Sequence, residues 1–156
     1  MEYITETFLP YARILTPLLI EGLQITLYVS AAAFVLSTIL GAVLAGIQHF
    51  KVKGLAWLVK LYISYFRGTP LLIQLFLFYY GLPMVFDVMK QCPKVLALII
   101  CLALNSAAYI SEAIRGAIDS VEQGQYEASL AFGMTRYQMM TRIVLPQAAV
   151  AAIPPI

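Results

Sequence analysis

An uncharged stretch, "LQITLYVSAAAFVLSTILGAVLAGIQ", runs from Leu23 to Gln48 and restricts the folds that this chain can adopt. About 20 consecutive apolar residues are enough for a helix to cross the hydrocarbon layer of a bilayer. The chain as a whole is 62% apolar and only 12% charged, which is more apolar surface than one small soluble core can bury. We therefore predict an integral membrane protein whose first span covers about residues 23–48.

A second apolar stretch covers about residues 55–82 and contains a predicted break. Pro70, after Gly68 and Thr69, removes a backbone donor and its ring clashes with the preceding turn, so a helix should bend there. We expect a first arm over about residues 55–66 and a second arm to Tyr80. The sequence Gly81-Leu82-Pro83 is predicted to end the second arm.

The third predicted span covers about residues 95–114, and the start of another occupies 143–156. Fourteen residues of helix rise about 21 Å, which is too short to cross the bilayer. The predicted fold is therefore a single all-α membrane domain over residues 1–156, with three full transmembrane helices and the beginning of a fourth.

Lys and Arg near the spans indicate which side of the membrane each connection occupies. Cytoplasmic connections carry an excess of these residues. The loop at residues 49–54 contains two lysines and the segment at 115–142 contains three arginines, so both are assigned to the cytoplasm and the N-terminus to the outside.

Small residues recur at four-residue spacing in the first span. Gly41 with Ala45, and Ala42 with Gly46, form a pattern that lets a second helix approach closely. The alternative is the ordinary glycine and alanine content of membrane helices.

The predicted cytoplasmic segment contains an amphiphilic stretch of two short helices. Residues 125–132 are good helix formers, and Gly133 can close that helix in the left-handed conformation. Thr135 then begins a second helix, with Gln138 placed to complete a capping box. The first helix would present a knob, with Glu127 at its rim, to a groove on another protein. The alternative is an amphipathic helix lying on the membrane surface.

Glu127 with the two small residues after it, then Gly133, then Ile143 to Pro146 stand at spacings that resemble the EAA signature of ABC importer permeases. The signature is Glu-Ala-Ala, then Gly, then Ile-x-Leu-Pro at fixed intervals, and Ser129 is the one departure. The matching residues are Glu127, Ala128, Ser129, Gly133, Ile143, Leu145 and Pro146. The stretches "LLIEGLQITLYVSAAAFVLSTILG", "FRGTPLLIQLFLFYYGLP" and "ALNSAAYISEAIRGAIDSVEQGQYEA" resemble the subfamily that imports polar amino acids.

The resemblance implies a type I ABC importer permease fold in a bacterial inner membrane, and a mechanism. The segment 125–135 would contain the coupling helix, which docks on a separate ABC ATP-binding subunit that holds ATP and Mg. The family also pairs two permease chains, identical or related, and receives substrate from an extracytoplasmic solute-binding protein. Members of the family continue beyond Pro154-Pro155, so we expect this chain to be a fragment or a truncated product.

Polar residues inside the third span share one face. Asn105, Tyr109, Glu112 and Gly116 are spaced i, i+4, i+7 and i+11. One reading is a wall of the amino-acid pathway, with Asn105 and Tyr109 binding the substrate. The other has Asn105 tying helices together and Glu112 pairing with Arg115. Arg67, near the bend, is expected to extend to the cytoplasmic interface, and the alternative is a role in the pathway.

Other functional classes find less support. The chain has no Gly-x-x-x-x-Gly-Lys-Ser/Thr phosphate loop, so ATP hydrolysis would fall to a partner. Its single histidine, His49, has no Cys or Asp beside it, so neither a metal site nor an integral membrane enzyme is predicted. No basic stripe interleaved with aromatics indicates nucleic-acid binding. A helical scaffold or channel subunit without transport activity stays open as the alternative.

Overall fold

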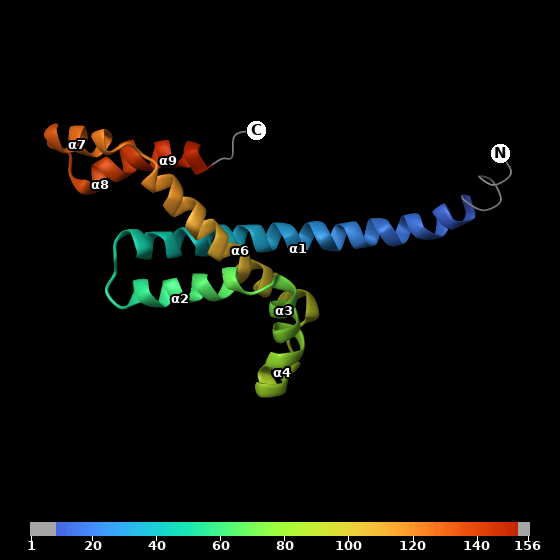
Figure 1. Ribbon diagram of the computed structural model, residues 1–156. Helices are drawn as coiled ribbons and strands as arrows, with labels where there is room; N and C mark the ends of the chain where they lie inside the picture. The colour runs from blue at the N-terminus through green and yellow to red at the C-terminus, as the bar shows by residue number, and fades with distance from the viewer. Residues whose placement is uncertain (1–8, 153–156) are drawn as a thin grey trace.

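The computed structural model describes residues 9–152, and all regular elements within that range are helices (Figure 1). Two of them, α1 (Leu9–His49) and α6 (Lys94–Asp119), are long and apolar enough to cross a membrane. A third crossing is available if α2 (Leu55–Gly68) and the helical arm that follows it count as one bent span. The predicted all-α membrane architecture is confirmed. The last four residues of the fourth predicted segment, 153–156, lie outside the described range.

Helix α1 begins at Leu9, well before the predicted start of the first span at Leu23. Its 41 residues correspond to about 60 Å, roughly twice the thickness of the hydrocarbon layer. The predicted start was set by the charge of Glu21, whereas a helix needs only its own backbone hydrogen bonds and good helix formers to continue. Helix α1 therefore continues through Glu21, and it also contains Pro17.

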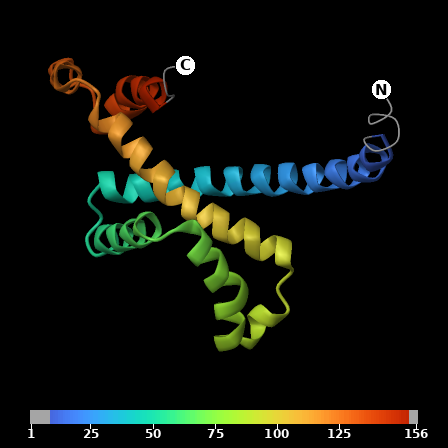
Figure 2. The ribbon, with the colours of Figure 1, turned by 45° about the vertical axis from the view of Figure 1, so that its right-hand side comes forward.

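Helix α6 crosses α1, and their close approach depends on Gly41 (Figure 2). A Cβ atom at Gly41 would lie 2.7 Å from Cγ2 of Ile110 and 3.2 Å from the carbonyl oxygen of Ala107. Ala45 is 1% exposed. The close-approach interpretation is thus confirmed for Gly41 and Ala45. No described helix of this chain packs on the offset pair, because Ala42 is exposed and Gly46 has open space around it.

The predicted bend lies between α2 and α3 (Leu71–Phe76), where the chain turns by 105°. Gln74 is 1% exposed and its amide nitrogen donates to the carbonyl oxygens of Phe66 and Thr69, both at 3.0 Å. These are carbonyls that the broken helix leaves without their usual donors. The carbonyl groups that the bend frees therefore have a hydrogen-bond donor in the Gln74 side chain.

The prediction that Gly81-Leu82-Pro83 ends this arm is wrong. The chain continues through a π-helical turn, η2 (Leu77–Gly81), into α4 (Leu82–Val85). The Leu82 N–H bonds to the carbonyl of Leu77, five residues back. This wider turn accommodates Pro83, whose ring would otherwise crowd the carbonyl four residues before it.

The same arrangement recurs at the second Leu-Pro pair. The turn η3 (Met140–Val144) precedes α9 (Leu145–Ala152), and the Leu145 N–H bonds to the carbonyl of Met140. Pro146 therefore lies inside a continuous helical path that begins at α8 (Arg136–Met139). The predicted start of the fourth segment after Arg142 is wrong for the same reason.

Two apolar clusters hold the described helices together. The first joins α1, α2 and α6 around Leu44, Val59, Ile63, Phe66, Ala107 and Ala108. The second packs the end of α6 against α8, η3 and α9, around Ala117, Ile118, Met139, Val144 and Ala148. The short helices α5 (Asp87–Lys90) and α7 (Gln123–Ala131) complete the described chain. α6 continues to Asp119, past the predicted end at Ile114, so the first residues of the 115–142 segment belong to it.

The loop after α1 and the α7–α8 segment lie at the same end of the molecule (Figure 1). Residues from both line one groove, among them Lys51 and Arg136. The two segments that the charge pattern assigns to the cytoplasm thus share one side, as predicted. Their assignment to the cytoplasm itself stays a prediction.

Candidate functional site

The helix α7 ends at a corner built around Gly133, which has φ of 76°. The Gly133 N–H bonds to the carbonyl of Leu130 at 2.9 Å, and the Met134 N–H bonds to that of Ser129 at 3.1 Å. This pair of bonds is the Schellman motif, in which a glycine takes the left-handed position. The predicted glycine corner is confirmed, and its hydrogen bonds fix the end of α7.

A capping box begins the second helix immediately after the corner. The Thr135 hydroxyl accepts from the Gln138 N–H at 3.3 Å, and the Gln138 side-chain oxygen accepts from the Thr135 N–H at 2.9 Å. The capping box thereby gives partners to the backbone N–H groups of Thr135 and Gln138 at the start of α8. The predicted helix–corner–helix is confirmed, with α7 displaced by two residues from the expected start at Gln125.

Contacts on the inner side of α7 fix it to the end of α6. The Tyr126 hydroxyl donates to the carbonyl oxygen of Ile118 at 3.3 Å. Burial, and secondarily the charge of Asp119, raises the pKa of Tyr126, so this hydroxyl keeps its proton. Ser129 is 5% exposed and donates to the carbonyl of Gln125 at 2.6 Å. The one departure from the EAA signature therefore buries a hydroxyl without leaving it unsatisfied.

The outer side of α7 is open. Glu127 and Ala128 are exposed, and the Glu127 carboxylate accepts a hydrogen bond from Gln123 at 3.1 Å. Phe132, at the tip beside the corner, is 88% exposed. Phe132 did not stand out in the sequence, although an aromatic residue directly before the predicted glycine corner was the available signal. An exposed aromatic on a rigid knob is a typical anchor for a partner protein.

The later part of the signature lies on a different element. Ile143 is in η3, and Leu145 and Pro146 begin α9. Val144 between them is 0% exposed and belongs to the second apolar cluster. This stretch therefore fixes the base from which α7 and α8 project, and the structure does not bring it into the exposed face of α7.

A second polar site surrounds Glu112 near the ends of α1, α2 and α6. Its carboxylate contacts Arg115 at 2.8 Å and Arg67 at 3.4 Å, and it accepts from the Gln48 amide at 3.4 Å. The Arg67 guanidinium also lies 5.6 Å from the ring centroid of Tyr109. The predicted Glu112–Arg115 pair is confirmed. The Arg67 guanidinium thus lies against Glu112 and Tyr109 of α6, and its extension to the cytoplasmic interface stays a prediction.

Asn105 lies on the same face of α6, seven residues before Glu112. Its amide nitrogen donates to the side-chain oxygen of Gln74 at 2.9 Å and lies 3.4 Å from the carbonyl of Phe66. Asn105 thus ties α6 to the bend, as one of the two readings predicted. The assignment of Asn105, Tyr109 and Glu112 to a substrate pathway stays a prediction.

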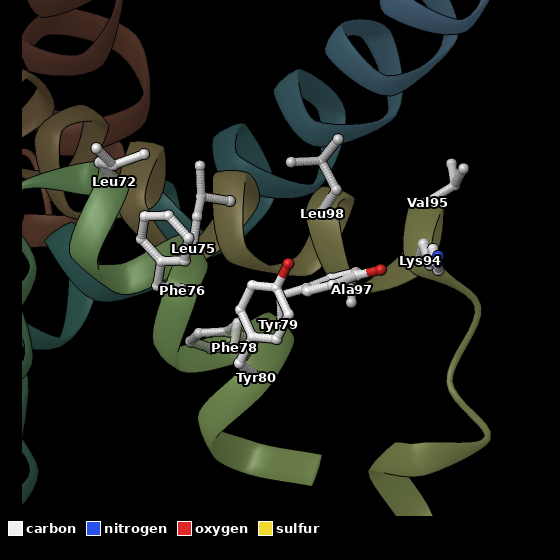
Figure 3. Close-up of a pocket in the computed structure, with 10 residues that line it drawn as sticks. All are labelled: Leu72, Leu75, Phe76, Phe78, Tyr79, Tyr80, Lys94, Val95, Ala97 and Leu98. Atoms are coloured by element: carbon white, nitrogen blue, oxygen red, sulfur yellow. The ribbon is translucent and has the colours of Figure 1, made fainter.

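An apolar cavity of about 340 Å³ lies between α3, η2 and the start of α6 (Figure 3). Its lining includes Tyr79, Tyr80, Ala97 and Leu98, and the Lys94 ammonium lies 5.7 Å from the ring centroid of Tyr79. Across residues 9–152 no group of three or more His, Cys, Asp or Glu side chains is placed to hold a metal ion. The cavity can accommodate apolar groups and has no arrangement suited to acid–base chemistry.

Fold and site together define a helical membrane protein that carries a stiff helical projection at one end. The sequence matches the family described as binding-protein-dependent transport system inner membrane component over residues 37–156. The chain belongs to this family, which confirms both the membrane location and the resemblance found in the sequence.

Named relatives are amino-acid permeases. The chain is 50% identical over 138 residues to the probable amino-acid permease protein YxeN of Bacillus subtilis (strain 168), covering 88% of this chain and 62% of that relative. It is 47% identical over 144 residues to the probable amino-acid ABC transporter permease protein PatM of Vibrio harveyi, covering 92% and 65%. The chain therefore spans less than two thirds of the length of either relative.

A solved structure, described as the crystal structure of an amino acid ABC transporter with histidines, shares the fold. It superimposes with a TM-score of 0.84 at 37% identity, covering 92% of this chain and 66% of that one. The predicted ABC importer permease fold is thereby confirmed.

Proposed function

We propose that this chain forms the membrane-spanning permease part of an ATP-driven importer of a polar amino acid. The observation that carries the proposal is the α7–corner–α8 projection, whose residues match a permease signature and whose outer face is open. Relatives named as amino-acid permeases support the substrate class. Transport is favoured over an enzyme or a passive scaffold for the same reasons.

In this mechanism α7 docks on a separate ATP-binding subunit that holds ATP and Mg. Closure of the ATPase subunits on ATP pushes the exposed knob of Glu127, Ala128 and Phe132. The Gly133 corner and the capping box keep α7 from folding away, and its bond to α6 through Tyr126 passes the displacement to the membrane helices. A second permease chain would complete the pathway, and an extracytoplasmic solute-binding protein would deliver the amino acid.

Within the membrane, Asn105, Tyr109 and Glu112 line one face of α6 and are candidates for the pathway. Tyr109 is 50% exposed, which leaves its ring available to a second chain or to substrate. Glu112 forms ion pairs with Arg67 and Arg115, so a zwitterionic amino acid would meet groups of both signs there.

The test is substitution of Glu127→Lys in cells that express this permease together with its ATP-binding subunit. We expect ATP-dependent amino-acid uptake and co-purification of the ATPase to be lost, because the charge on the docking face is reversed, while membrane insertion is unchanged. The matched control is Glu122→Lys, which makes the same charge change on an exposed residue next to α7. Full uptake by Glu127→Lys would refute the docking assignment, and absence of any ATPase partner would favour the scaffold.

A further inference from the structure

A groove separates the loop after α1 from the α7–α8 segment. Its apolar lining comes from Phe50, Leu130, Met139 and Met140. The nitrogen-bearing side chains on its rim are His49, Lys51 and Arg136, and Tyr126 completes the lining. Its volume is about 470 Å³, large enough for a phosphate-bearing headgroup with the first part of an acyl chain.

The cationic side chains of the groove form no ion pairs among the described residues. Neither Lys51 nor Arg136 forms an ion pair with any of residues 9–152. The groove lining includes no Asp or Glu. An apolar floor beneath uncompensated cations is complementary to a ligand that is both apolar and anionic.

The conformation of Lys51 is a second, independent observation. The Lys51 N–H bonds to the carbonyl of Gln48 at 3.1 Å, and the Val52 N–H bonds to that of Ile47 at 3.2 Å. This is the same Schellman corner as the one at Gly133, but a lysine with φ of 50° occupies the position that favours glycine. A side chain at this position is disfavoured by backbone sterics, so its presence at the groove needs a compensating role.

Location decides which partner the groove fits. Tyr126 and Leu130 lie on one face of α7, whereas Glu127 and Ala131 lie on the next face of the helix. The proposed ATPase contact uses the outer face and leaves the groove free. The groove also lies where the long apolar helix α1 ends at His49, and we expect this end of a spanning helix to lie near the lipid headgroups.

From these observations we infer that the groove binds an anionic phospholipid of the cytoplasmic leaflet. The phosphate lies between Lys51 and Arg136, and the acyl chain lies over Phe50 and Met140. Such a lipid would link the loop after α1 to the base of α7. The inference goes beyond the proposed transport function and does not depend on it.

The test places a fluorescent reporter in the groove. Trp57 is the only tryptophan of the chain, so Phe50→Trp combined with Trp57→Phe gives a single tryptophan at the lining. The protein is reconstituted in phosphatidylcholine vesicles that contain either brominated phosphatidylglycerol or brominated phosphatidylcholine at equal bromine content. We expect phosphatidylglycerol to quench more strongly, and the difference to shrink at high salt.

Variants of the rim then locate the site. Lys51→Gly and Arg136→Gln should each weaken the preference for phosphatidylglycerol about fivefold, from about 1 kcal/mol per basic residue at an anionic membrane. Lys51→Gly suits the left-handed corner, so loss of the preference cannot be attributed to misfolding. Lys53→Gln, an exposed lysine of the same loop outside the groove, is the matched control.

Three results would overturn the inference. Equal quenching by the two lipids excludes a selective site. An equal effect of Lys53→Gln and Lys51→Gly means diffuse surface charge. Loss of ATPase co-purification in Lys51→Gly, without any lipid preference in the parent protein, assigns the groove to the protein partner. Normal uptake by Glu127→Lys would refute the transport coupling alone and leave the quenching result unchanged.

Discussion

Replacement of Gln74 by leucine tests whether the bend between α2 and α3 depends on one buried side chain. Its amide nitrogen donates to the carbonyls of Phe66 and Thr69, and to the Thr69 hydroxyl at 2.6 Å. Its side-chain oxygen accepts from Asn105 at 2.9 Å. Gln74→Leu is close in volume, so the main change is the loss of these bonds.

The structure sets the size of the effect. The variant leaves the Thr69 carbonyl without its side-chain donor, and the Asn105 amide keeps only its 3.4 Å contact with the Phe66 carbonyl. Each buried polar group left unsatisfied costs about 1–3 kcal/mol. Interhelical hydrogen bonds in membrane proteins average only about 0.6 kcal/mol, which lowers the expectation. We therefore expect a loss of about 2–3 kcal/mol in the free energy of unfolding.

The assay is equilibrium unfolding from dodecylmaltoside micelles by sodium dodecyl sulfate, followed by far-ultraviolet circular dichroism. Gln147→Leu, at an exposed position of α9, is the matched control and should change stability little. The double variant Gln74→Leu with Asn105→Leu should lose less than the sum of the single losses, because it removes the orphaned amide. A cost for Gln74→Leu no larger than that of Gln147→Leu would refute the reasoning.

Three further predictions concern backbone positions, measured by the same unfolding assay. Gly41→Leu should destabilise the protein by about 1–3 kcal/mol, because its side chain meets the backbone of α6 at Ala107; Gly46→Leu, with open space around it, is the control. Gly133→Ala should cost about 1–2 kcal/mol through its left-handed φ alone, since nothing lies within 4 Å of the new Cβ; a cost near zero would contradict the corner. Lys51→Gly should stabilise by up to about 1 kcal/mol, and a loss of stability would show that the lysine side chain contributes to folding.

Helix–corner–helix geometry shows how much local sequence can predict. The corner at Gly133 and the capping box of Thr135 with Gln138 were both expected and both observed. Each depends on bonds between residues at most five positions apart, so the residue types in a short window are sufficient. The two π-helical turns were not expected, since a proline signals only that the regular ladder is interrupted and not how the chain absorbs it.

The sequence alone determined that this is a helical membrane protein, where it bends, and which segment projects. Only the tertiary structure decided the 105° angle of the bend, the partner of Asn105 at Gln74, and the grouping of Arg67 with Glu112. The physical reason is distance along the chain. A polar side chain in a membrane needs a partner, but several were available to each of these residues, and the crossing of α6 over α1 and α2 selected among them.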